Sequence, residues 1–222
     1  MAGPKLVSTT THYLFTFAPM KKLLLVIACL YILPCMGQKF NGGLVLGAAF
    51  TQVDGDVMAG YNKLGLQFGG FVNRKLSKNV KGQMEIGYIG KGSKRGANPD
   101  KGIFDYRKIS LNYLEVPVVV QLWIEKIKLH LEGGLSYGVL ISSKEEDENG
   151  ETVLVGPFKK NEIGLIAGFC YDFSDRLVGN FRFGYSILPV ANKVVILNGR
   201  TVGGSYNNSV QVRLNYLLND PK

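Results

Sequence analysis

Residues 127–141 read IKLHLEGGLSYGVLI, a stretch in which large apolar side chains alternate with polar residues or glycine. One face carries Ile127, Leu129, Leu131, Leu135, Tyr137, Val139 and Ile141, and the other carries Lys128, His130, Glu132, Gly134, Ser136 and Gly138. This period of two predicts a β-strand, because successive side chains of a strand point to opposite faces of the sheet.

The same alternation returns along the chain and predicts eight strands. They are expected at about residues 40–53, 63–75, 80–92, 109–124, 127–141, 160–172, 177–190 and 206–218. Each is long enough to cross a membrane at a tilt, for which about 9–11 residues suffice. The connections alternate between long and short, as in barrels with short turns at one end and long loops at the other. The predicted fold is all-β, an eight-stranded antiparallel up-and-down transmembrane β-barrel.

The polarity of the two faces predicts which one lies inside the barrel. The interior of an eight-stranded barrel is just wide enough for side chains to fill, so the many large apolar residues would overcrowd it. We therefore expect the apolar faces to contact lipid and the polar faces to line the lumen. The luminal charges are Glu85, Glu115, Lys128, Glu132, Arg182 and Arg213, which we expect to form an ion-pair network that plugs the barrel. The alternative is an ion path through the lumen.

The composition agrees with this assignment. The chain has 222 residues with 28 glycines, 46% hydrophobic and only 19% charged residues, which excludes intrinsic disorder and favours a β-rich protein whose outer surface is not in water. Trp123, Tyr171 and Phe173 lie beside predicted short turns, where we expect part of an aromatic girdle at the membrane interface.

The first 37 residues have the layout of an exported precursor. Met20, Lys21 and Lys22 precede an apolar run from Leu23 to Leu33, and small residues follow, which predicts a signal peptide over Met20–Gly37 behind an upstream extension. The start codon is Met1 or Met20. A membrane anchor and a lipoprotein that uses Cys29 are the alternatives. The domains are therefore 1–37, removed on export, and 38–222, the barrel.

Removal of residues 1–37 lowers the formal charge from +9 to +6, because it takes away three lysines and no acidic residue. Cys170 is then the only cysteine, which excludes an internal disulfide and favours a small buried filler. His130 is the only remaining histidine, expected as a packed luminal residue beside Glu132 and Lys128. We predict no catalytic residue, cofactor site or metal site, no enzymatic activity, and no nucleic-acid partner.

Two predicted loops carry charges of opposite sign. Residues 91–108 hold six basic residues, Lys91, Lys94, Arg95, Lys101, Arg107 and Lys108, which suit the phosphates of lipopolysaccharide. Residues 145–151 read EEDENGE and suit weak binding of a divalent cation. For both, the simpler interpretation is a solvated outer loop.

The segment Tyr113-Leu114-Glu115-Val116-Pro117 resembles a motif of the PorT-like, or porin-family, outer-membrane β-barrels. The opening residues 42–47 (GGLVLG) and the glycines of residues 164–168 also resemble that family. The resemblance implies an outer-membrane barrel of a Gram-negative bacterium without a catalytic site. It covers about residues 38–218, but the chain departs from the family's usual end because NDPK follows Leu218, which leaves Tyr216 and Leu218 as carriers of the assembly signal. Pro117 lacks a ladder donor, and we expect it at a β-bulge that directs Glu115 into the lumen.

Three functions are compatible with these observations. The first is a structural or interaction role for a filled barrel that displays long extracellular loops. The second is a narrow porin-like channel for small solutes or ions, and the third is a soluble, secreted, lipocalin-like carrier. The expected partners of the first are outer-membrane lipids, including lipopolysaccharide, and the barrel-assembly machinery during insertion, with the barrel as a monomer.

Overall fold

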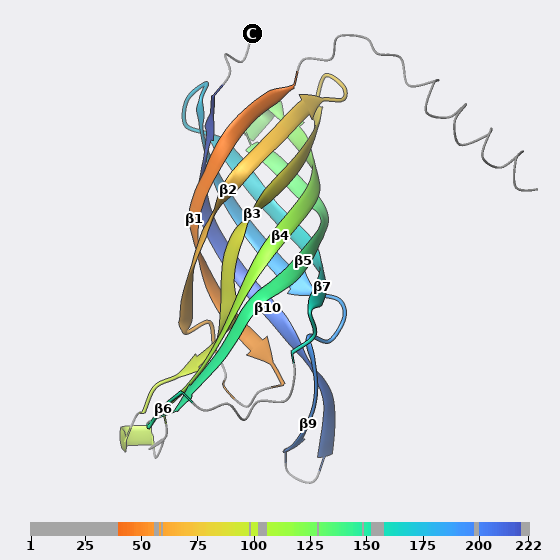
Figure 1. Ribbon diagram of the computed structural model, residues 1–222. Helices are drawn as coiled ribbons and strands as arrows, with labels where there is room; N and C mark the ends of the chain where they lie inside the picture. Colours follow the sequence, from red (N-terminus) through yellow and green to blue (C-terminus); the bar gives the residue numbers. More distant parts are fainter. Residues whose placement is uncertain are drawn as a thin grey trace, which may run out of the picture. The chain divides into compact units, whose positions relative to one another are not determined.

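The barrel is a closed ring of eight antiparallel strands, as predicted (Figure 1). The computed structural model describes residues 40–55, 58, 60–97, 99–101, 106–127, 129–147, 149–151, 158–197 and 200–218. The ring consists of β1 (Asn41–Asp54), β2 (Lys63–Lys75), β3 (Val80–Arg95), β4 (Arg107–Ile124), β5 (Leu129–Asp147), β7 (Asn161–Asp172), β8 (Leu177–Ser186) and β10 (Arg200–Leu217). Each strand pairs with its neighbour in chain order, and β1 pairs with β10 from Gly43↔Leu217 to Asp54↔Tyr206. No edge is left open where the ring closes, so the backbone groups there are paired as a lipid environment demands.

The two ends of the barrel differ in their connections. The short connections β2–β3, β4–β5 and β7–β8 lie at the end where β1 begins and β10 finishes, which we call the short-turn end. A 3-10 turn, η2 (Glu125–Ile127), belongs to this end. The opposite, long-loop end carries η1 (Pro99–Lys101) and two additional strands, β6 (Gly150–Glu151) and β9 (Ala191–Leu197). Among the described residues, no helix is long and apolar enough to cross a membrane.

Several strands run further toward the long-loop end than the sequence pattern predicts. The β4–β5 ladder continues to Arg107↔Asp147, and β10 begins at Arg200 and pairs with β9 as a hairpin. The expected loops at 93–108, 142–159 and 191–205 are therefore shorter than predicted. The reason is that polar residues predominate in the strand extensions of β4 and β5, so the alternation of apolar and polar side chains fades although the backbone stays paired. Figure 1 shows these extensions and the β9–β10 hairpin beyond the ring.

Side chains alternate in and out of the barrel with the polarity inverted relative to a soluble protein. Leu135 on β5 is 52% exposed, whereas Arg182 and Arg213 are each 1% exposed. Large exposed apolar residues occur on every strand of the ring, and the buried set is rich in Gln, Asn, Glu, Ser and Arg. The apolar faces therefore form an outer belt suited to lipid, as expected.

Glycine on the luminal face lets the strands coil tightly around a narrow interior. A Cβ atom at Gly65 on β2 would lie 1.9 Å from the carbonyl oxygen of Gly90 on β3. Only glycine fits such an approach, because no side-chain carbon can come that close to a backbone oxygen.

The bulge lies at a different place from the one expected. The β4–β5 register shifts between Asn112 and Tyr113, where Ile141 is the extra residue on β5. At Pro117 the pairing with β5 runs through Pro117↔Ser136 without a shift, so the expected bulge at Pro117 is wrong. The missing donor of Pro117 is accommodated on the β3 side, where the register is unchanged but no pair forms between Met84↔Val118 and Gly87↔Glu115. Glu115 points inward by simple alternation.

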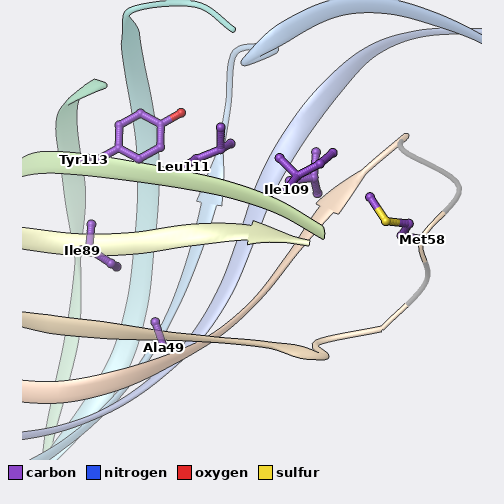
Figure 2. Packing of buried hydrophobic residues seen from close by; sticks show 7 residues of the cluster. Ala49, Met58, Ile89, Ile109, Leu111 and Tyr113 are labelled. Carbon is purple, nitrogen blue, oxygen red and sulfur yellow. The ribbon is translucent and has the colours of Figure 1, made fainter. Parts of the chain in front are cut away.

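An apolar cluster fills the lumen near the long-loop end. It consists of Ala49, Val53, Met58, Ile89, Ile109, Leu111 and Tyr113, against which Leu140 and Phe158 pack (Figure 2). A smaller cluster of Val45, Phe71 and Leu217, with Val178 against it, lies toward the short-turn end. Polar luminal residues lie between these two clusters.

Candidate functional site in the barrel lumen

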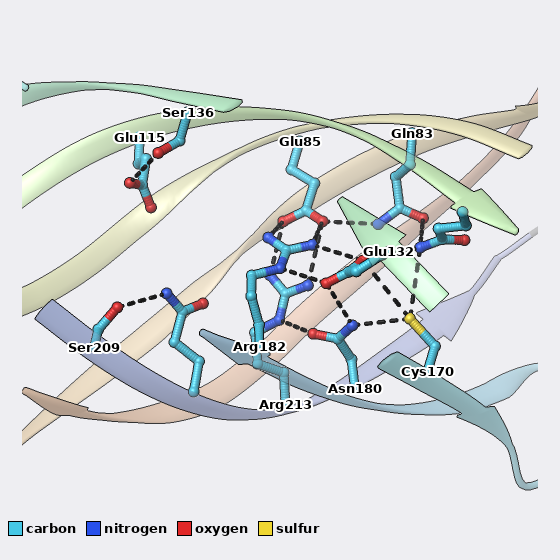
Figure 3. A network of polar contacts seen from close by, with 12 residues as sticks. Gln83, Glu85, Glu115, Glu132, Ser136, Cys170, Asn180, Arg182, Ser209 and Arg213 are labelled. Carbon is cyan, nitrogen blue, oxygen red and sulfur yellow. Dashed lines mark hydrogen bonds and ion pairs between the residues drawn. The ribbon is translucent and has the colours of Figure 1, made fainter. Parts of the chain in front are cut away.

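Four charged side chains from four strands meet in the middle of the lumen. Arg182 of β8 donates from Nε to Glu132 Oε1 over 2.6 Å and from Nη2 to Glu85 Oε1 over 2.8 Å. Arg213 of β10 donates from Nη1 to Glu85 Oε2 over 2.8 Å. These residues, which we call the central charge cluster, are all buried and are shown in Figure 3. Two carboxylates face two guanidinium groups, so the cluster is electrically balanced.

Amide side chains complete the hydrogen bonds of the central charge cluster. Asn180 donates to Glu132 over 2.9 Å and accepts from Arg213 Nε over 2.7 Å. Gln83 donates to Glu85 over 2.7 Å, and Gln121 donates to Glu132 over 3.2 Å. Buried ions are tolerated only when they are paired and their remaining polar atoms are bonded, and this arrangement meets both conditions.

Cys170 belongs to the same layer as a buried free thiol. Its Sγ lies 2.8 Å from Asn180 Nδ2 and 3.7 Å from Glu132 Oε2. The thiol is thus enclosed by hydrogen-bonding side chains of the lumen.

A second group of charges, the outer ion cluster, lies nearer the long-loop end. Lys91 of β3 donates from Nζ to Glu115 over 2.9 Å and to Glu162 over 2.8 Å. Ser136 donates to Glu115 over 2.9 Å, and Asn207 donates to Glu162 over 2.6 Å. Glu115 was predicted in one network with the other luminal charges, and the structure places it here instead.

Lys91 corrects the prediction of a basic loop over residues 91–108. It is 5% exposed, on the luminal face of β3, with its ammonium 5.3 Å from the centre of the Tyr113 ring. It is therefore unavailable to an external phosphate. Lys128, also predicted in the network, lies outside the described residues.

The remaining charged segments at the long-loop end pair with each other. Arg107 contacts Glu145, and Lys108 donates to Glu146 over 2.9 Å, across the extended β4–β5 ladder. The hydrogen bond to Glu146 holds the pKa of the Lys108 ammonium above its usual value. No group of three or more metal-ligating side chains in the described part of the chain could hold a metal ion. Arg107 and Lys108 of the basic segment thus lie in a strand extension, where they pair with Glu145 and Glu146 of the acidic segment.

His130 lies at the short-turn end, and its contacts differ from the expected neighbours Glu132 and Lys128. Its Nε2 is 3.0 Å from Asp172 Oδ2, and its ring centre is 4.5 Å from that of Trp123. Trp123 therefore lies on the luminal side of β4 and is not part of an outward girdle. Tyr171 and Phe173 are exposed on the outside and pack edge to face, with ring centres 5.4 Å apart.

Lys91 and Glu162 are two of the buried charged residues that the sequence pattern left out of the predicted network. Glu162 alternates in phase with Gly164 and Gly168 on β7, and this pattern placed it on the polar face. Lys91 lies in the predicted strand 80–92 in phase with Glu85, so the alternation indicated the luminal face, but the residue was counted with the loop 91–108.

Comparisons with known proteins agree with this architecture. The family model described as "Outer membrane protein beta-barrel domain" matches residues 36–192. No curated protein sequence matches the chain.

Solved structures of similar topology are distant in sequence. Ail, the attachment invasion locus protein of Yersinia pestis, aligns at 13% identity with a TM-score of 0.46, over 81% of this chain and 99% of that one. Neisserial surface protein A (NspA) aligns at 9% identity with a TM-score of 0.48, over 79% and 96%. OprG from Pseudomonas aeruginosa aligns at 11% identity with a TM-score of 0.34, over 80% and 92%.

The family match carries the assignment, because it spans well over half of the chain. A place in the outer membrane also accounts for the outward apolar belt, because these side chains then contact lipid. The chain belongs to the outer membrane protein beta-barrel domain family and is an integral, non-enzymatic protein of the bacterial outer membrane.

Proposed function

We propose that this protein is a closed barrel with a filled lumen, which acts through the surface presented at its long-loop end. The observation that carries the proposal is the layering of the lumen. Toward the long-loop end, the balanced central charge cluster is followed by a level in which the outer ion cluster and the apolar cluster interleave, since Ile89 and Lys91 of β3 pair with Tyr113 and Leu111 of β4. Each level is made of side chains that contact one another across the barrel.

The channel alternative has less support from this geometry. Glu85 is held by both Arg182 and Arg213, so an ion would have to displace paired, buried groups in order to pass. Removing one partner from a buried pair is costly, which argues against such displacement. The soluble carrier fails on its requirement for an apolar interior, since the large apolar residues of the ring strands are exposed on the outside.

The long-loop end is proposed to face the cell exterior, since outer-membrane barrels place their short turns in the periplasm. The extensions of β3, β4 and β5 and the β9–β10 hairpin would then project from the outer surface and offer backbone and charged side chains to a partner. Lipopolysaccharide is the proposed neighbouring lipid at the long-loop end. The barrel-assembly machinery is the proposed partner during insertion into the membrane. The segment Tyr113–Pro117 supports a place in the PorT-like branch of the family.

Export of the chain is part of the proposal. Residues 1–37 lie outside the described residues, and we propose cleavage of a signal peptide after Gly37. The family match starts at residue 36, close to this point, which supports a barrel domain of residues 38–222.

Cysteine labelling of whole cells tests the orientation of the barrel. Asn149→Cys and Lys78→Cys, made in a Cys170→Ser background, place one thiol at an exposed position of each end. With a membrane-impermeant maleimide, we expect Asn149→Cys to react in intact cells and Lys78→Cys to react only after the outer membrane is permeabilised. Reaction of Lys78→Cys in intact cells, or protection of Asn149→Cys, would contradict the proposed display of the long-loop end.

A further inference from the structure

The short-turn end contains a cavity that the filled lumen does not use. Its volume is about 640 Å³, and its floor is formed by Gln83 and Gln121, the amides that cap the central charge cluster. This volume is in the range of about 300–1,000 Å³ typical of sites for small molecules. Gln83 and Gln121 therefore link the lining of the cavity to the central charge cluster.

The charges around the cavity balance one another. Lys75 and Lys81 contribute two positive groups to its lining, and Asp172 and Asp175 contribute two negative ones. A strongly charged ligand of either sign would therefore meet as many repelling as attracting groups. The balance favours a ligand without net charge.

Amide side chains supply the hydrogen-bonding capacity. Asn41, Asn73 and Asn215 line the cavity together with the two floor glutamines. Each amide both donates and accepts, which matches hydroxyl groups that do the same. Phe71 and Leu217 add an apolar patch to the lining, suited to the C–H face of a sugar ring.

Two lining side chains lack part of their hydrogen bonding. Within the described part of the chain, His130 Nδ1 and Asn215 Oδ1 are buried without a partner. Both residues are 3% exposed, and both line the cavity. Buried polar atoms are normally satisfied, but these two are covered by neighbouring protein atoms, so an occupant of the cavity can bond them only after the side chains turn toward it.

We propose that this cavity binds a neutral saccharide of mono- or disaccharide size. On the orientation proposed above, the site opens to the periplasm. The proposal depends on the lining and not on that orientation, so it can be tested on purified protein in any membrane mimic.

The single tryptophan offers a direct readout of binding. Trp123 contacts His130, which lines the cavity, so an occupant that moves His130 changes the surroundings of the indole. The purified barrel in detergent micelles would be titrated with maltose and with N,N′-diacetylchitobiose, and the heat of binding would be measured in parallel. Sodium glutamate and sodium phosphate serve as charged comparison probes.

We expect a saturable change in Trp123 fluorescence and a measurable heat with at least one saccharide, and neither with glutamate or phosphate. The absence of a saturable response to both saccharides at millimolar concentrations would overturn the proposal. Equal binding of the charged probes would also overturn it.

Two variants of β10 separate the cavity from the rest of the lumen. Asn215 and Gln211 lie on the same face of the strand, are equally buried, and each has an unpartnered amide oxygen, but only Asn215 lines the cavity. Asn215→Leu is expected to weaken saccharide binding at least about five-fold, and Gln211→Leu less than about two-fold. Equal weakening by both variants would contradict the site. If Asn215→Leu does not fold, Asn73→Leu on β2 replaces it with the same expectation.

Discussion

Replacing Arg182 by methionine is expected to lower the free energy of unfolding of the barrel by about 3–5 kcal/mol. The guanidinium of Arg182 pairs with both Glu85 and Glu132, and all three residues are buried. Arg182→Met leaves Glu132 without a cationic partner and the cluster with an excess negative charge. Chemical unfolding in phospholipid vesicles, followed by Trp123 fluorescence, measures the effect.

A double variant separates the loss of charge balance from the loss of packing. Arg182→Met combined with Glu132→Gln keeps the ion pair of Glu85 with Arg213 and restores neutrality. We expect this double variant to recover most of the lost stability. Lys78→Met removes the same charge at an exposed turn position and is expected to change the stability by less than about 0.5 kcal/mol. A small effect of Arg182→Met, or no recovery in the double variant, would contradict a balanced cluster.

The second large effect is expected on the outside of the barrel. Leu135→Arg places a charge in the middle of the apolar belt, where Val118 and Leu165 flank Leu135 on the paired strands. Arginine at the bilayer midplane of such barrels costs about 2–4 kcal/mol, because the guanidinium loses its hydration. We therefore expect Leu135→Arg to reduce the free energy of unfolding in vesicles by this amount.

Ile127→Arg is the matched control for depth. Ile127 is also exposed on the outside, but it lies in η2 at the short-turn end, where the cost falls to about 0–1 kcal/mol. A difference between the two variants would locate the belt in the hydrocarbon region. Equal and negligible effects at both positions would contradict contact of the belt with lipid.

The fold was predictable from sequence because lipid contact on one face and a narrow lumen on the other require apolar and polar residues to alternate along each strand. Positions such as Leu131 and Leu135 must be apolar, and Glu132 and Ser136 must be polar, so the period of two is strong throughout the membrane-crossing part. The alternation of long and short connections then fixes the up-and-down topology. Both features follow from local sequence.

The parts that were missed depend on contacts between strands. The extra residue Ile141 exchanges the inward and outward faces of β5 beyond it and so turns Glu145 toward Arg107, which no local pattern reveals. Pro117 is tolerated because β3 and β4 form no residue pair beside it, and the bulge expected from its missing donor does not occur. The partners of Lys91 come from β4 and β7, far away in the chain.

Conductance in a planar lipid bilayer tests the filled lumen most directly. We propose that the central charge cluster and the outer ion cluster close the lumen, so the purified protein is expected to give no stable single-channel openings. Arg182→Met, compared under the same conditions, shows whether any activity depends on the cluster. Large, stable openings of the wild-type protein would contradict the filled lumen.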